Sequence, residues 1–301
     1  MNKIIIVSGP TASGKSALAI DIAKKLNSQI VSADSMQIYR YMDIGTAKIT
    51  ESEMQNIKHY MLDVVNPDQE YSVSDYASTV KDIIANMHKN NMIPIICGGT
   101  GLYIDSILYP LSLGAKDDAV RQKYQKEYET YGATYIHDKL KAIDPKEAEK
   151  VHENNVKRVI RALEIYELTG KTKSEQKDRN ESLQYDTLLI TLNPDKETLY
   201  QRIDKRVDEM FDMGLVSEVK GLLDKGYGFD LQSMQAIGYK EFKGYFEGTD
   251  SLDYVKDEIK KGSRHYAKRQ VTWFKRYPFA NMCDINEKDE IMKLVDNFVR
   301  K

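Results

Sequence analysis

Gly9-Pro-Thr-Ala-Ser-Gly-Lys-Ser16 is the stretch of this sequence that decides the fold. It matches the pattern G-x-x-x-x-G-K-[ST], and it lies between the strand-like apolar run 3–7 and residues 16–26, whose apolar spacing is helical. In such a loop the glycines let successive backbone N–H groups converge on phosphate oxygens, and the following helix contributes the positive end of its dipole. The lysine contacts phosphate as a point charge, and the last hydroxyl is available to Mg²⁺. The stretch therefore predicts a phosphate site made of Gly9, Pro10, Thr11, Ala12, Ser13, Gly14, Lys15 and Ser16, with Ser16 as the metal ligand.

Further strand-like runs alternate with helical stretches along the chain. Strands are expected at residues 29–32, 61–65, 93–97 and 185–192, with a helix over 73–89. This alternation predicts an α/β fold, in which a phosphate-loop core has a central parallel sheet covered on both faces. Residues 113–182 are charged and helical in character, which predicts a helical insertion domain between two parts of the core, 1–112 and 183–301.

Composition sets the class of protein. The chain has 301 residues, of which 41% are hydrophobic and 30% charged, as in ordinary globular proteins. Its apolar runs are too short to cross a bilayer, and the first residues do not form a secretory signal. Cys97 and Cys283 are too few for a disulfide framework or a metal-binding pattern. We expect a cytoplasmic monomer that does not contact membranes.

The charge is unevenly distributed. The formal net charge is −2, yet residues 256–276 contain eight basic side chains and only two acidic ones. A local basic face on a mildly acidic protein predicts contact with one particular polyanion. The alternative is a solvated helix face of no special function.

Three short motifs follow predicted strands or lie near them. Asp34-Ser-Met-Gln37 follows the second strand, at the edge where parallel sheets bind ligands, so its carboxylate could bind a metal, position a nucleophile or accept a proton. The alternative is an Asp side chain that only caps a loop. Gly45-Thr-Ala-Lys48 offers a turn with a hydroxyl and a cation. In Cys97-Gly-Gly-Thr-Gly-Leu-Tyr103 the glycines permit close backbone approach and Thr100 can donate to an oxygen, or the run is merely a tight turn.

Two arginines are candidates for a phosphate clamp. Arg202 and Arg206 lie four residues apart on a predicted helix and so share a face. Arginine pairs with phosphate through several donors at once. The alternative is a set of surface ion pairs with Asp204, Asp208 or Glu209, and the sequence does not choose between the two arginines.

Together these motifs closely resemble those of one family, the bacterial-type tRNA dimethylallyltransferases, also called tRNA isopentenyltransferases. The matching segments occur in the family's order and span nearly the whole chain: GPTASGKS from Gly9, SADSMQIYR ending at Arg40, MDIGTAK ending at Lys48, GGTGLY from Gly98, NNVKRVIRALEIY from Asn154, QAIGYKE from Gln235 and KRQVTWFKR from Lys268.

The resemblance implies a reaction. The family transfers a dimethylallyl group from dimethylallyl diphosphate to N6 of the adenosine on the 3′ side of the anticodon, position 37 of tRNA. It implies that Asp34 takes the N6 proton, that Thr100 hydrogen-bonds the leaving or bridging oxygen, and that Arg206 and Mg²⁺ assist the departing diphosphate. It also implies an anticodon stem-loop contact through Asp34, Ser35, Met36, Gln37, Thr100, Arg121, Arg158, Val159, Ile160, Arg161 and Ala162.

The residues themselves suggest how two helices would serve this contact. Asn154 or Asn155 can cap a helix whose apolar side, from Val156 to Tyr166, packs inward and leaves Arg158 and Arg161 for phosphates. In the basic segment a second stripe, made of Tyr266, Gln270, Trp273 and Tyr277, is more typical of a core than of base stacking.

Two other functions compete with this one. A kinase of a nucleoside or small metabolite would share the phosphate loop, the acid after the second strand and the arginines, but not the basic aromatic segment near the C-terminus. An RNA-binding module with a vestigial phosphate loop would not need Lys15, Ser16, Asp34 and Thr100 to be intact.

Overall fold

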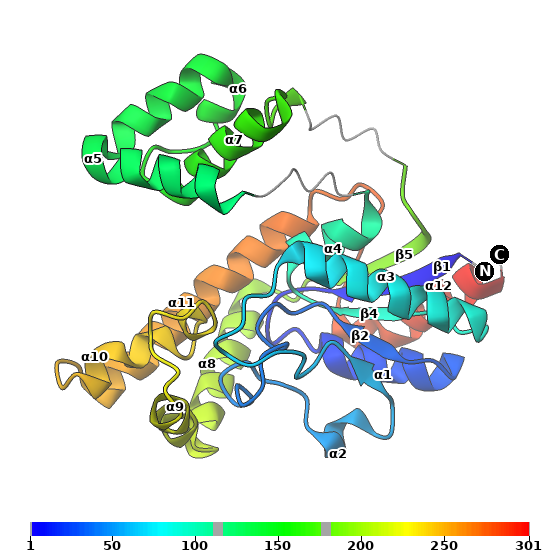
Figure 1. The fold of residues 1–301 in the computed structure, drawn as a ribbon. Coiled ribbons are helices and arrows are strands. Elements are labelled where there is room, and N and C mark those ends of the chain that lie inside the picture. The colour runs from blue at the N-terminus through cyan, green and yellow to red at the C-terminus, as the bar shows by residue number, and fades with distance from the viewer. Residues whose placement is uncertain (1, 111–116, 176–181, 301) are drawn as a thin grey trace. The chain divides into compact units, whose positions relative to one another are not determined.

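The computed structural model describes residues 2–110, 117–175 and 182–300, and the chain divides into two compact units (Figure 1). The core unit comprises Met1–Leu108 and Leu183–Lys301, and the helical unit comprises Tyr109–Ser182. Two separate parts of the chain thus build the core unit, and the segment between them builds the helical unit.

A six-stranded sheet forms the centre of the core unit, in the order β3-β2-β4-β1-β5-β6. All of its pairings are parallel. The strands are β1 Lys3–Ser8, β2 Ile30–Ser32, β3 His59–Tyr60, β4 Ile95–Gly98, β5 Asp186–Leu192 and β6 Asn281–Cys283. This arrangement confirms the predicted α/β class with a central parallel sheet.

Helices cover both faces of the sheet. Those of the core unit are α1 Lys15–Leu26, α2 Glu51–Met54, α3 Val73–Lys89, α4 Gly101–Leu108, α8 Lys196–Asp212, α9 Leu215–Asp224, α10 Lys243–Phe246, α11 Leu252–Phe274 and α12 Lys288–Arg300. Apolar side chains of α1 and α12 pack on β1, β4 and β5 in one buried cluster. Figure 1 shows α3 and α4 on the opposite face. Because β1 is buried on both sides, its sequence reads as a continuous apolar run.

One predicted strand is wrong, and one strand was not predicted. Residues 61–65 do not form a strand, because Met61 and Asp63 have φ angles of 65° and 54°, in the left-handed region that strands exclude. The strand there is β3, which ends at Tyr60, and Val65 forms only an isolated bridge with Tyr39. The sequence also gave no indication of β6, which is only three residues long.

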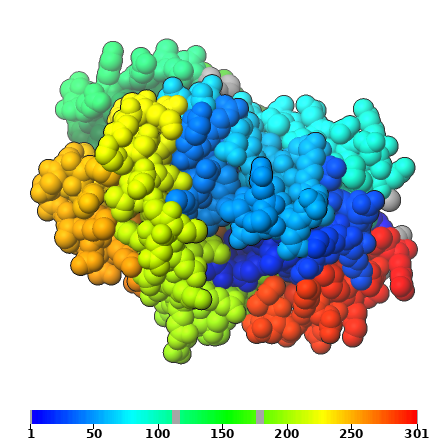
Figure 2. Space-filling model, turned by 90° about the horizontal axis from the view of Figure 1, so that it is seen from below, coloured from blue at the N-terminus to red at the C-terminus, as the bar shows by residue number. Residues whose placement is uncertain are grey.

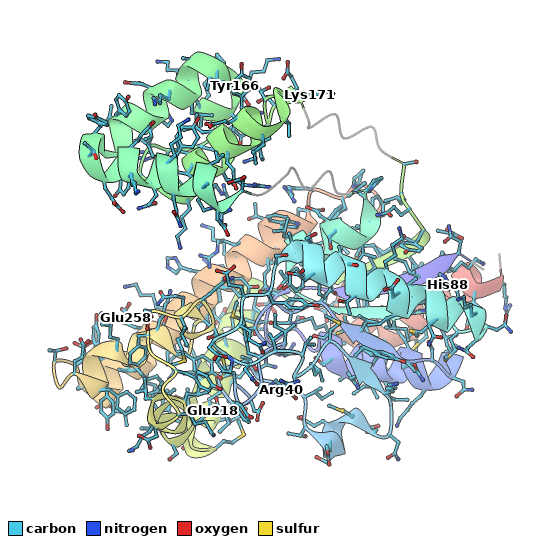
Figure 3. The ribbon with its side chains drawn as sticks, in the orientation of Figure 1. Arg40, His88, Tyr166, Lys171, Glu218 and Glu258 are labelled. Carbon is cyan, nitrogen blue, oxygen red and sulfur yellow. The ribbon has the colours of Figure 1, made fainter. Side chains whose placement is uncertain are left out.

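The helical unit has its own small core. Its helices are α5 Asp118–Ile143, α6 Pro145–Ala148 and α7 Val156–Thr169, and α5 bends at Gly132, whose φ is 86°. Apolar side chains of α5 and α7 pack against each other. Asn155 is the N-cap of α7 by position, but its side chain makes no capping hydrogen bond. Tyr166 is 39% exposed, so it does not pack inward as expected (Figure 3).

Among the described helices, none combines the length and the apolar character that a bilayer span would need.

Candidate active site

The phosphate loop joins β1 to α1 and is already folded. Gly9, Ala12 and Gly14 have φ angles of 145°, 61° and 89°, and Gly14 is the N-cap of α1. A side chain at Gly9 would lie 2.8 Å from the carbonyl oxygen of Leu192, so this position needs a glycine for both its angle and its space. The Ser13 hydroxyl is buried without a hydrogen-bond partner among the described residues. The loop therefore presents a curled backbone and an unused donor.

Two cations, Lys15 and Arg206, are buried at the phosphate loop, and burial disfavours the charged form of each. Burial lowers the pKa of the Lys15 ammonium; the charge of Arg206 adds to this effect, whereas Cys97 and Asp34 oppose it. Lys15 Nζ donates to the Pro10 carbonyl oxygen at 3.2 Å, and Arg206 Nη1 donates to Thr11 Oγ1 at 3.3 Å. Burial also lowers the pKa of the Arg206 guanidinium. A bound polyanion would restore the charge balance of both groups.

One buried amide joins the phosphate loop to α11. Gln270, only 4% exposed, accepts from the Thr11 N–H at 2.9 Å and donates through Nε2 to the Gly99 carbonyl oxygen at 3.0 Å. The sequence predicted that Gln270 and Tyr277 belong to a core stripe, and both are buried, Tyr277 just beyond the end of α11. Sequence reasoning gave Gln270 no function, because its partners lie far away in the chain.

Asp34 lies in a tight turn directly after β2. Its Oδ1 accepts from the N–H groups of Met36 at 2.9 Å and Gln37 at 3.4 Å, so it does cap its loop. Its other oxygen, Oδ2, makes no hydrogen bond within the described part of the chain. Oδ1 thus fixes the carboxylate in the turn, while Oδ2 remains available to accept a proton or bind a ligand. Asp34 can therefore cap its loop and act on a substrate at the same time.

Thr100 supports this turn from the neighbouring strand end. Its Oγ1 accepts from the Ser35 N–H at 3.1 Å, and its backbone N–H donates to the Ala33 carbonyl oxygen at 3.0 Å. The Tyr266 hydroxyl also hydrogen-bonds Thr100, and burial raises the pKa of Tyr266 to about 12. The hydroxyl of Thr100 is therefore engaged within the protein.

Gly98 makes the close approach of these two strand ends possible. A Cβ atom there would lie 2.2 Å from the carbonyl oxygen of Ala33, which is backbone and cannot move aside. We expect Gly98→Ala to lower the free energy of unfolding by about 1–3 kcal/mol through overpacking. Chemical denaturation measures this change.

Gly221 is the matched control for Gly98→Ala. It lies within α9, and a Cβ atom there meets nothing within 4 Å. Gly221→Ala should stabilise the protein, by up to about 1 kcal/mol, because alanine favours the helix. If both substitutions changed the free energy of unfolding equally, the backbone at Gly98 would not be closely packed against Ala33.

A pocket of about 540 Å³ brings the loop and the turn together. Its lining includes Thr11 through Ser16, the turn Asp34–Gln37, and Arg206. Apolar side chains such as Met36, Val207 and Met210 line it as well, and Tyr266 and Arg269 contribute from α11. Thr100 and Arg202 are not among the lining residues. The pocket thus offers cations, a carboxylate and an apolar surface within one space.

The contacts made by α8 favour Arg206 as the phosphate clamp. Asp204 pairs with Arg264 at 2.6 Å, and Asp208 pairs with Lys256 and Lys260 at 2.8 and 2.6 Å. Glu209 pairs with Lys205 at 3.5 Å. The three acids considered as surface partners thus pair with other cations, whereas Arg206 donates to Thr11 in the phosphate loop.

The basic segment is less available than its composition indicates. Besides the three cations already paired with Asp204 and Asp208, Lys261 pairs with Glu258 at 3.0 Å and Arg276 with Asp105 at 3.5 Å. Within the described ranges, Lys268, Arg269 and Lys275 have no ion-pair partner and are exposed. The expected polyanion face on α11 is thus reduced to these three side chains.

The lysine of the motif Gly45-Thr-Ala-Lys48 is also engaged. Lys48 pairs with Asp43 at 2.6 Å and with Asp63 at 2.7 Å, and its side chain is only 5% exposed. It stabilises its own loop and is not a free cation for a ligand.

The residues expected to contact RNA in the helical unit separate into two groups. Val159, Ile160 and Ala162 are at most 4% exposed and lie in the unit's own core, so their side chains are not available to RNA. Arg158 is exposed. Arg121 and Arg161 pair with the buried Glu164 at 3.3 and 2.7 Å. Only the arginines of this set can reach a phosphate.

Ser16 is the residue that fits a metal ion. It lines the pocket at the start of α1, beside Lys15. The described residues contain no cluster of three or more His, Cys, Asp or Glu side chains that could hold a metal alone. A single hydroxyl beside a phosphate loop suits Mg²⁺ that takes most of its ligands from phosphate oxygens and water.

Comparisons with known proteins give consistent results. The family model described as IPP transferase matches residues 37–277. A curated protein of Thermoanaerobacter sp. (strain X514), named tRNA dimethylallyltransferase, is 48% identical, with 99% of this chain and 96% of that protein covered. One of Bacillus cereus (strain AH187), with the same name, is 46% identical over 99% of this chain and 96% of its own length.

Solved structures extend the comparison. The full-length tRNA isopentenylpyrophosphate transferase of Bacillus halodurans is 39% identical, with a TM-score of 0.75, and the match covers 100% of this chain and 97% of that one. A eukaryotic dimethylallyltransferase acting on tRNA is 32% identical, with a TM-score of 0.79 over 91% of this chain and 70% of that chain.

Proposed function

The chain belongs to the IPP transferase family, and we propose that it transfers the dimethylallyl group of dimethylallyl diphosphate to N6 of adenosine 37 in tRNA. The products are N6-(dimethylallyl)adenosine and diphosphate. One observation carries this proposal beyond the family: a single pocket holds a phosphate loop, an apolar wall and the carboxylate of Asp34. These are the groups that a prenyl diphosphate and an amine nucleophile require.

The phosphate loop and Arg206 bind the leaving group. As the bond between the allylic carbon and oxygen breaks, its electron pair remains on the diphosphate, whose charge rises. Lys15 and Arg206 are held at the loop by hydrogen bonds to Pro10 and Thr11. Together with the loop N–H groups they would stabilise that charge from fixed positions. The same interactions do not require a hydrolytic water, which distinguishes this use of the loop from nucleotide hydrolysis.

Asp34 acts on the other reactant. N6 of adenine is a weak nucleophile because its lone pair is delocalised into the ring. As N6 forms a bond to the allylic carbon, its proton passes to the free Oδ2 of Asp34, while Oδ1 remains bonded to the turn. Thr100 holds this turn through the Ser35 N–H. Its role is therefore to position Asp34, in addition to any contact with the leaving oxygen.

Mg²⁺ fits the proposal as a ligand of the diphosphate. Ser16 would hold it, and it would neutralise part of the charge that develops on the leaving group.

The RNA partner is the anticodon stem-loop. Its adenine has to leave the loop stack to enter the pocket, which costs least in a single-stranded loop. Arg269 lines the pocket. Lys268 on the same helix and Lys275 at its C-terminal end are exposed cations without acidic partners in the described ranges. In the helical unit, Arg158 is exposed. Arg121 and Arg161 pair with Glu164, and we propose that they contact RNA phosphates from these ion pairs. We place the reaction in the cytoplasm, where tRNA is available, and propose that a monomer carries it out.

The function is tested by product analysis. Unmodified tRNA is incubated with the protein, Mg²⁺ and either dimethylallyl diphosphate or ATP, and the nucleosides are then analysed by mass spectrometry. We expect dimethylallylated adenosine only with the prenyl donor. Phosphate transfer from ATP to a nucleoside would favour the kinase alternative, and binding without any chemistry would favour the RNA-binding module. The names of the relatives favour prenyl transfer.

A further inference from the structure

Two motifs of the core unit, residues 42–48 and residues 235–241, have no part in the reaction described above, yet one carboxylate joins them. Glu218 of α9, labelled in Figure 3, accepts from the N–H groups of Asp43, Ile44 and Gly45 at 2.9, 2.7 and 3.0 Å. Its Oε1 also accepts from the Tyr239 hydroxyl at 2.6 Å. Figure 2 shows the yellow-green and yellow part of the chain lying against the blue segment that contains the first motif.

The contact between the two motifs is close. Tyr239 is fully buried, and a side chain at Gly45 would lie 2.5 Å from its ring. Three successive N–H groups that converge on one carboxylate make the arrangement by which backbones bind anions. Here Glu218 supplies the anion from within the protein. The loop of residues 42–48 is therefore held by hydrogen bonds to Glu218 of α9 and by close packing of Gly45 on the Tyr239 ring.

This loop reaches the active site. Gly45, Thr46 and Ala47 line the pocket. The carbonyl oxygens of Thr46 and Ala47 accept from Gln37 Nε2 at 3.2 and 3.3 Å. Because the Gln37 N–H donates to Asp34 Oδ1, the loop and the catalytic turn are joined by hydrogen bonds.

The loop needs external contacts to keep its shape. Ala47 has a φ of 49°, in the left-handed region that alanine disfavours. Such a conformation persists only where surrounding interactions hold it. Glu218 provides three of these interactions, and Lys48 provides others through Asp43 and Asp63.

We propose that Glu218 is a positioning residue for the prenyl transfer: it fixes residues 43–45, and through Gln37 it sets the orientation of the Asp34 carboxylate relative to the phosphate loop. The inference rests on the proposed function. Glu218 is not among the residues that line the pocket, so its removal should affect turnover and leave diphosphate binding intact.

The test is the substitution Glu218→Gln. The amide keeps the shape of the side chain but turns an N–H₂ group toward backbone N–H donors. We expect kcat to fall about 10- to 100-fold, because displacing a reacting group by about 1 Å can have an effect of this size. The KM for dimethylallyl diphosphate and the Kd for inorganic diphosphate, measured by calorimetry, should remain those of the unaltered protein.

Two further variants make the result specific. Asp224→Asn removes an acid of the same helix that pairs with Lys220 on the surface, and it should leave kcat unchanged. Tyr239→Phe keeps the buried ring but loses the hydrogen bond to Glu218, and it should lower kcat in the same direction but less. If Glu218→Gln does not fold, Tyr239→Phe decides the question alone.

Several results would overturn the inference. A normal kcat in a folded Glu218→Gln, or a parallel loss of inorganic diphosphate binding, would show that Glu218 has no positioning role or only a general structural one. If the unaltered protein forms no prenylated adenosine, the proposed function fails, and this inference fails with it. An active unaltered protein with a fully active Glu218→Gln would overturn the inference alone.

Discussion

Asp34→Asn should slow prenyl transfer by at least about a hundredfold, the usual contribution of a positioned general base. Asparagine keeps the oxygen that accepts from the N–H groups of Met36 and Gln37, so the turn should survive. It replaces the free oxygen by an N–H₂ group, which cannot take the proton of N6. The measurement is single-turnover formation of the modified nucleoside with saturating tRNA and donor.

The control for this substitution is Asp34→Ala, which removes both oxygens. If Asp34 only caps its loop, the alanine variant should be much slower than the asparagine variant, which would then be nearly normal. If Asp34 is the base, both should be slow. Affinity for the anticodon stem-loop should be retained in Asp34→Asn, because the turn, through which we expect contact with RNA, is preserved.

Local sequence patterns were enough to predict those parts of the fold and of the site that a single stretch of the chain forms. The helix expected over residues 73–89 is α3 with the same limits, because Ser72 and Asp75 form a capping box at its start. The phosphate loop follows from its own glycines, whose positive φ angles no other residue adopts as easily. The parallel sheet follows from short, fully apolar strands that alternate with helices.

Contacts between distant segments could not be predicted in this way. The amide of Gln270 joins Thr11 to Gly99, and the carboxylate of Glu218 joins residues 43–45 to Tyr239. Nothing in the local sequence distinguishes these two side chains from other polar residues of a helix. They could be recognised only once the fold had brought their partners together.

The sequence predicted the availability of charged side chains less well than it predicted the helices and strands. The excess of basic residues in 256–276 indicated an open polyanion face, but Asp204 and Asp208 on α8 neutralise several of them. A count of charges along one segment cannot include acids supplied by another helix. Val159 and Ile160 show a different case: the apolar spacing of their helix predicted that they pack inward, and both are core residues of the helical unit. The family motif alone implied that they contact RNA.

Arg206→Met should reduce kcat/KM for dimethylallyl diphosphate by about 10²- to 10³-fold, the effect of removing one donor that stabilises charge in a transition state. Arg206 lines the pocket and donates to Thr11 in the phosphate loop. Methionine preserves much of the length and apolar volume of the side chain, so the surrounding helix should remain folded. The loss should appear in both kcat and KM, because the diphosphate is charged before and after the bond breaks.

Arg202→Met provides the comparison that the sequence could not decide. Arg202 lies one helical turn earlier on α8 but does not line the pocket, so its replacement should leave kcat/KM nearly unchanged. Arg206→Lys refines the interpretation, since lysine restores the charge without the planar fork of donors. Partial recovery in Arg206→Lys would mean that charge dominates, and no recovery would mean that the geometry of the guanidinium matters more. A large loss in Arg202→Met with a small one in Arg206→Met would reverse the assignment, and the loop contact through Thr11 would then have no catalytic meaning.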